Sequence, residues 1–147
     1  MDVYPWLKAL HILFAVVAVG FNISYGIWLV RATREPQHIG FALRGIKFMD
    51  DRVANPAYIG LLVVGVILVL AGGWGFTTLW VLASLILYSV LIVVGLGLYS
   101  PTLSRQIAVY EAEGPEAPEF AALSARGRVL GIILGVLVVV IILLMVT

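Results

Sequence analysis

The sequence contains no cysteine and little charge. Without cysteine among its 147 residues, disulfides, thiolate metal sites and thiol catalysis are excluded. Only 12% of the residues are charged and 63% are hydrophobic, whereas globular chains are about half apolar and about a quarter charged. Too few polar side chains remain to cover a small soluble domain. The composition therefore predicts a membrane protein and excludes a soluble enzyme, a disordered chain and a nucleic-acid-binding protein.

Groups that ligate metals are scarce as well. The only histidines are His11 and His38, and all eight acidic residues lie outside the long apolar runs. No calcium-loop, phosphate-loop or metalloprotease motif occurs in the sequence. We therefore predict no metal site, identify no catalytic residue and favour a protein that is not an enzyme.

Four long apolar runs dominate the chain. A bilayer core about 30 Å thick needs roughly 20 helical residues, and residues 9–30, 53–74, 77–99 and 129–146 reach or approach that length. In lipid the backbone must hydrogen-bond within its own helix, and the alternating pattern of a membrane barrel is absent. We predict an all-α polytopic protein in which residues 1–147 form a single four-helix transmembrane domain, packed as a bundle.

The connections between the runs differ in length and charge. Residues 72–76 predict a tight hairpin, whereas residues 31–52 and 100–128 are long and polar, the first compatible with an amphipathic helix. Eight of the nine basic residues lie in the two long connections, and only Lys8 lies opposite. Because basic residues accumulate on the cytoplasmic face, both long connections should be cytoplasmic and both termini outside. We expect the first run to be a retained span in the cytoplasmic (inner) membrane, because it lacks a clear cleavage site.

Two runs carry a stripe of polar and small side chains on one helical face. In the first run the stripe holds Lys8, His11, Ala15, Ala18, Asn22 and Tyr25. In the third run the same spacing joins Ser84, Tyr88, Leu91, Gly95 and Leu98. The two faces should meet inside the bundle, which makes Asn22, Tyr25, Ser84 and Tyr88 its predicted polar interior. Interhelical hydrogen bonding is the favoured role for these groups, and contact with a substrate is the alternative.

The fourth run and its approach carry two consecutive GxxxG steps, at Gly127, Gly131 and Gly135. Small residues let membrane helices approach closely. A packing seam within the chain is favoured over a seam to a second copy by roughly two to one. Besides the lipid bilayer, a homo-oligomer or a larger membrane complex therefore stays open as a partner.

Among the residues inside the spans, His11 is the clearest candidate for ligand binding or proton transfer. It lies about one turn from the boundary marked by Trp6 and Lys8. Haem ligation, quinol proton transfer and ion binding would all use an imidazole at that depth. Residue type alone favours a hydrogen-bonded structural histidine. His38 lies on the opposite side, about 30 Å of helix away, so a cofactor at His11 would need Lys8, a tyrosine, water or a second subunit as its other ligand.

Asp50, Asp51 and Arg52 stand at the cytoplasmic end of the second run. Adjacent helical residues point about 100° apart, so the two carboxylates form no dyad on one face. Lys47 can pair with either carboxylate. A charge cluster at a helix end is the default interpretation, and its role is left open. Pro56, just inside the span, frees a backbone carbonyl and permits a kink.

Three segments resemble known families: WLKALHILFAVVAVG, FALRGIKFMDD and LVLAGGWGF. Span for span, the chain resembles a family of small bacterial four-span predicted integral membrane proteins of unknown function. It is distantly similar to the group that includes HemJ-type protoporphyrinogen oxidases and CopD-type membrane proteins, also through FMDDRVANPAYIG. In HemJ-type enzymes the LKALHI-like start supplies a histidine implicated in haem b binding. The resemblance thus implies a haem b or porphyrin site at His11 and Lys8, although the histidines expected in the second cytoplasmic loop are missing.

Three functions fit a small membrane protein with these features. The first is the binding of haem or a porphyrin near the outer end of the first helix. The second is a transporter or channel subunit with a polar path through Asn22, Tyr25, Ser84 and Tyr88. The third is a structural subunit that docks through its glycine strip. The lack of a mid-span acid weakens the second, because coupled transport usually needs one.

Overall fold

The computed structural model describes residues 3–146, so residues 1, 2 and 147 of the predicted domain lie outside the described part. Within it the chain is helical and contains no strand. The α-helices are α1 (Tyr4–Arg34), α2 (Ile39–Met49), α3 (Asn55–Ala71), α4 (Leu79–Ile92), α5 (Ser100–Glu113) and α6 (Pro118–Val146). A 3₁₀ turn, η1 (Pro36–His38), precedes α2, and two π-helical segments are η2 (Asp50–Ala54) and η3 (Val93–Tyr99).

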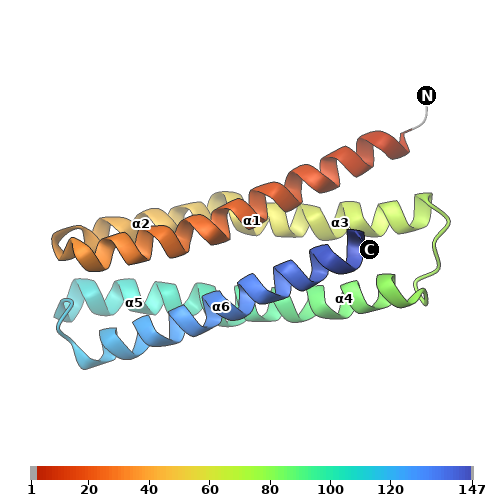
Figure 1. Cartoon of the computed structure of the whole chain (residues 1–147). Helices are drawn as coiled ribbons and strands as arrows, with labels where there is room; N and C mark the ends of the chain where they lie inside the picture. Colours follow the sequence, from red (N-terminus) through yellow and green to blue (C-terminus); the bar gives the residue numbers. More distant parts are fainter. Residues whose placement is uncertain (1–2, 147) are drawn as a thin grey trace.

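The π-helical segments join neighbouring α-helices end to end, so α2 continues into α3 and α4 into α5 (Figure 1). Four helices are long and apolar enough to cross a membrane: Tyr4–Arg34, Pro36–Ala71, Leu79–Glu113 and Pro118–Val146. The prediction of an all-α polytopic protein is confirmed. The amphipathic segment expected between the first two runs is not a separate helix, because it extends the second spanning helix.

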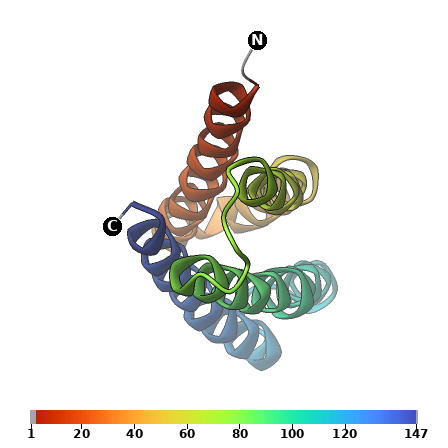
Figure 2. The ribbon, with the colours of Figure 1, turned by 90° about the vertical axis from the view of Figure 1, so that its right-hand side faces the viewer.

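The helices form two layers. Figure 1 shows α1 lying along α2 and α3, and α6 lying along α4 and α5. The start of α1, the end of α6 and the connection at residues 72–78 lie at one end of the bundle, and η1 and residues 114–117 lie at the other. Figures 1 and 2 both show the N-terminal part of α1 diverging from the remaining helices. The side chains there, such as Trp6 at 69% exposed, face away from the bundle.

Each π-helical segment ends directly before an α-helix that has proline in its first turn. The N–H of Asn55 bonds to the carbonyl of Asp50, and the N–H of Ser100 bonds to that of Gly95, which are both i to i−5 bonds. Pro56 and the proline after Ser100 have no N–H, so an unbroken α-helical ladder is impossible at both places. One extra residue in the turn accommodates each proline without ending the helix.

The extra residue in η3 rotates the interior face of the third spanning helix. Ser84, Tyr88 and Leu91 are buried, as the sequence spacing predicts. Beyond them the expected stripe is wrong, because Leu98 is 38% exposed while Tyr99 is only 8% exposed. A π-helical turn shifts the helical register by one position. As a result Tyr99 faces the interior in place of Leu98.

The short connections use glycine and aromatic contacts. Gly73 follows α3 with a φ of 69°, and the Trp74 and Trp80 rings meet edge to face at 5.5 Å. Thr78 occupies the N-cap position of α4 in an extended conformation, without a side-chain cap. The predicted hairpin is thus present, but its connection covers residues 72–78 and not 72–76, because α4 begins only at Leu79.

The glycine strip of α6 lies beside the buried face of that helix, not within it. The buried positions in its apolar part are Leu130, Leu134, Val138 and Ile141. A Cβ added at Gly131 or Gly135 would meet no atom within 4 Å, and one at Gly127 would meet only the Gln106 side chain, at 4.0 Å. The role of this strip as a packing seam stays a prediction.

Candidate functional site

The two adjacent carboxylates at the start of the second apolar run face different surroundings. Asp50 is 5% exposed, whereas Asp51 is exposed and pairs with Lys47, the Nζ–Oδ1 distance being 2.5 Å. Their separation around the helix follows from the angle between successive residues. Only Asp51 therefore behaves as a surface charge at a helix end. The sequence places Asp50 outside the apolar run, but the continuous helix carries its side chain into the bundle.

A small cavity lies beside Asp50. Its volume is about 20 Å³, and its polar lining consists of Asn22, Tyr25, Asp50, Asn55, Tyr58 and Tyr99. Apolar side chains of α4, η3 and α6 complete the wall. A cavity needs roughly 10–15 Å³ to hold one water molecule. The space therefore suits a single water molecule or an ion of similar size.

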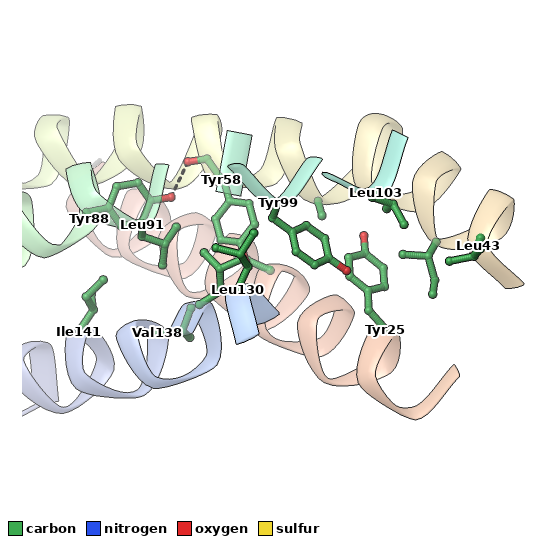
Figure 3. Close-up of a cluster of buried hydrophobic side chains, with 14 of the residues drawn as sticks. Tyr25, Leu43, Tyr58, Tyr88, Leu91, Tyr99, Leu103, Leu130, Val138 and Ile141 are labelled. Carbon is green, nitrogen blue, oxygen red and sulfur yellow. Dashed lines mark hydrogen bonds between the residues drawn. The ribbon is translucent and has the colours of Figure 1, made fainter. Parts of the chain in front are cut away.

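Tyr58 is the centre of the hydrogen bonds around this cavity. The Asn22 amide in α1 donates to the Tyr58 hydroxyl. The Tyr88 hydroxyl in α4 donates to the Tyr58 carbonyl at 2.7 Å, the bond drawn as a dashed line in Figure 3. Asn22 and Tyr88, which the sequence predicts as interior residues of two different runs, thus both bond to Tyr58 of α3. Figure 3 also shows Tyr88, Tyr58, Tyr99 and Tyr25 in succession along the interior.

The hydroxyl of Tyr25 is buried without a hydrogen-bond partner among residues 3–146. The whole residue is 5% exposed. An unsatisfied buried hydroxyl costs about 1–3 kcal/mol, so its retention beside a cavity calls for a ligand or a water. The Ser84 hydroxyl is also unpaired within the described residues, but Ser84 does not line this cavity.

The carboxylate of Asp50 has neighbours that stabilise its charge. Burial disfavours this charge, and three neighbours offset that cost in part: Asn55 donates to Oδ2 at 3.4 Å, the Ser100 hydroxyl hydrogen-bonds the carboxylate, and Lys47 adds a nearby positive charge. Lys47 in turn donates to Ser100 Oγ at 2.9 Å. This contact joins α2 to α5 at the side of the cavity nearest the long connections.

A second cavity lies between α1 and α2. Its volume is about 200 Å³, and its lining is mostly apolar, with Phe21, Trp28, Phe41 and Met49 among its walls. Tyr25 lines both cavities. Tyr25 is thus shared by the mostly apolar cavity and the polar cavity at Asp50.

The predicted cofactor residues lie elsewhere. His11 is half-buried, and a Cβ added at Gly65 would lie 2.9 Å from its Cε1, so the imidazole packs closely on α3. Lys8 is exposed, and neither residue lines either cavity. His38 is exposed at the end of η1, with its Nδ1 3.2 Å from Glu35 Oε2. The predicted haem site at His11 and Lys8 therefore lies apart from both cavities, and it stays a prediction.

Comparison with protein families decides what kind of protein this is. The model of the family described as "Predicted integral membrane protein (DUF2269)" matches residues 5–147. The chain belongs to this family. The resemblance seen in the sequence to predicted integral membrane proteins is thereby confirmed. No curated protein and no solved structure matches the chain.

The family description assigns a membrane protein and no reaction, so the site itself must supply the functional argument. The sequence identifies Asn22 and Tyr25 as interior residues but not Tyr58, Tyr99 or the inward position of Asp50. One signal for the missed residues is present. A polar residue directly before proline occurs at Asn55 and again at Ser100; Asn55 lines the cavity, and Ser100 follows Tyr99, which lines it as well.

Proposed function

We propose that this protein is a transporter or channel subunit that binds one small monovalent cation, such as Na⁺, in the cavity at Asp50. The observation that carries this proposal is a carboxylate, only 5% exposed, beside a cavity of atomic size within a helix long and apolar enough to span a membrane. Ionisable groups in such helices are costly and mark ion or proton pathways.

The charge balance of the site selects a monovalent cation. Asp50 and Asp51 carry two negative charges, and Lys47 carries one positive charge that pairs with Asp51. One buried negative charge is left at Asp50, and burial of a charge is costly unless it is paired. A single positive charge neutralises it, whereas a divalent cation would leave an excess.

The neutral groups of the cavity suit a hard cation. Asn22, Asn55 and Tyr25 bring amide and phenol oxygens to the same small space as the carboxylate. Oxygen ligands are the ones that hard cations such as Ca²⁺ and Mg²⁺ prefer, and the same preference extends to Na⁺. The unpartnered Tyr25 hydroxyl gives the clearest support, because a bound cation would satisfy its oxygen.

This proposal replaces haem binding as the leading hypothesis. His11 contributes one imidazole packed against Gly65, whereas the Asp50 cavity joins several polar side chains from three helices. The haem site at His11 and Lys8 stays a prediction from residue type and resemblance. A structural subunit of a larger membrane complex, or a homo-oligomer, is compatible with the cation site.

Cation flux in liposomes tests the proposal. We expect purified protein to increase Na⁺ uptake over empty liposomes, and Asp50→Asn to reduce that uptake at least tenfold. Asp51→Asn is the matched control, because it removes an exposed carboxylate from the adjacent position and should retain most of the uptake. Uptake equal to that of empty liposomes, or equal uptake by the wild type and Asp50→Asn, would refute the function.

We also propose that one four-helix transmembrane domain, with spans at about residues 9–30, 53–74, 77–99 and 129–146, lies in the inner membrane with its long connections cytoplasmic. The basic residues of those connections support this orientation. The chain has no cysteine, so Gln37→Cys and Thr77→Cys each provide a unique label. An impermeant maleimide should label Thr77→Cys in intact cells and Gln37→Cys only after permeabilisation; the reverse pattern would invert the topology.

A further inference from the structure

We propose that Lys47 acts as a built-in competitor for the cation at Asp50, because its ammonium group, linked to Asp50 through the Ser100 hydroxyl, lowers the affinity of the site for a second positive charge. This inference rests on the proposed function and concerns the regulation of the same site. Lys47 would therefore be a positioning residue that sets cation affinity, while Asp50 binds the cation.

The burial of Lys47 distinguishes it from the other ion-paired cations. Its side chain is 22% exposed, whereas those of Arg31, Arg44 and Arg105 are 67%, 55% and 62% exposed. Exposed ion pairs contribute little because water screens them. A mostly buried ammonium keeps more of its effect on nearby charges.

The contacts of Lys47 lead directly to the cavity. Its Nζ donates to Ser100 Oγ at 2.9 Å and pairs with Asp51. Ser100 in turn hydrogen-bonds Asp50, which lines the cavity. An ammonium, a hydroxyl and a carboxylate therefore form a chain between α2, α5 and η2. Lys47 precedes the two aspartates by three and four residues, so its long side chain can reach either carboxylate.

Competition follows from the sign of the charges. A cation bound at Asp50 and the Lys47 ammonium are both attracted by the same carboxylate, the ammonium through the Ser100 hydroxyl. Two positive charges in a poorly screened site repel each other. Either the ammonium moves away from the Ser100 hydroxyl, or the cation binds weakly. Removing the charge of Lys47 should accordingly strengthen cation binding, whereas a purely structural link between helices would affect stability alone.

Sodium binding to the purified full-length protein tests this inference. We expect Lys47→Met, which keeps the apolar stem, to lower the dissociation constant for Na⁺ by about tenfold. Lys47→Gln, which keeps a group able to bond to Ser100, should do the same, and Lys47→Arg should bind as the wild type does. Arg44→Met is the control, because it removes an exposed ion-paired cation of the same helix and should leave the constant unchanged.

These binding measurements distinguish failure of the proposed cation site from failure of the proposed role of Lys47. If Asp50→Asn binds Na⁺ as the wild type does, or the wild type binds none, the proposed function is wrong and this inference falls with it. If Asp50→Asn abolishes binding while folded Lys47→Met and Lys47→Gln bind no more tightly than the wild type, the cation site stands and the role of Lys47 is structural. Thermal unfolding identifies the folded variants, and Lys47→Gln serves if Lys47→Met does not fold.

Discussion

The side-chain amide of Asn22 in α1 donates a hydrogen bond to the hydroxyl of Tyr58 in α3. The backbone carbonyl of Tyr58 accepts a second bond, from Tyr88 in α4. Since α1 and α4 belong to different layers, Tyr58 connects the two layers next to the cavity at Asp50. Lipid supplies no hydrophobic force between helices, so such bonds and close packing hold membrane bundles together.

Removal of the Tyr58 hydroxyl should therefore destabilise the bundle modestly. Tyr58→Phe deletes the acceptor of Asn22 and keeps the backbone carbonyl that Tyr88 uses, so we expect a loss of about 1 kcal/mol in the free energy of unfolding. Denaturation in detergent, followed by circular dichroism, measures it. Ser89→Ala is the control, since the exposed Ser89 hydroxyl bonds within its own helix, to the Leu85 carbonyl. An equal loss in both variants would contradict the role of Tyr58.

The shifted register in η3 predicts that the adjacent residues Leu98 and Tyr99 contribute very differently to the free energy of unfolding. Tyr99 is buried and Leu98 is exposed, so Tyr99→Ala should cost about 3 kcal/mol or more, as large buried side chains do. Leu98→Ala should cost under about 1 kcal/mol. The same unfolding measurement compares the two. A larger cost at Leu98 would mean that the helix keeps the regular α-helical spacing.

Leu98 and Tyr99 also show how much of the fold can be predicted from the sequence. Apolar runs of spanning length and their polar connections are sufficient for four helices, because lipid leaves the backbone few alternatives. The regular spacing that correctly buries Ser84 and Tyr88 fails at Leu98, because a π-helical turn adds one residue. Proline indicates a disturbed ladder, but a kink, a break and a π-helical turn are all consistent with it.

The inward position of Asp50 was missed for a related reason. Apolar content marks the span as beginning near Val53, yet the helix continues unbroken from α2 through η2. Which of Asp50 and Asp51 faces the interior depends on the neighbours of that helix, and no periodic pattern in the sequence contains this information. The depth and direction of a single charge at a span boundary require the packed structure.

The glycines of α6 allow a test of packing within the chain. A Cβ at Gly131 or Gly135 meets open space, so the double Gly→Ala variant should lose no unfolding free energy and should gain about 0.5–1 kcal/mol at each position from the higher helix propensity of alanine. Gly40→Ala is the comparison, because its Cβ would lie 2.5 Å from Tyr110 Cε1 and should cost about 1–3 kcal/mol. A similar loss in the double variant would identify the strip as a seam within the chain.

Tyr25→Phe should separate the stability of the empty site from its affinity for a cation. The deleted hydroxyl is buried and has no partner among residues 3–146, so without Na⁺ the variant should melt at the same temperature as the wild type or higher, because an unsatisfied group is lost.

A ligand stabilises a protein in proportion to the logarithm of its concentration over its dissociation constant. If the hydroxyl oxygen helps to hold Na⁺ beside Asp50, added NaCl should raise the melting temperature less in Tyr25→Phe than in the wild type, with choline chloride as the ionic-strength control. Acidification should weaken the Na⁺ effect in both proteins, because protonation neutralises the carboxylate that attracts the cation. An equal Na⁺ effect in both proteins would remove Tyr25 from the cation site.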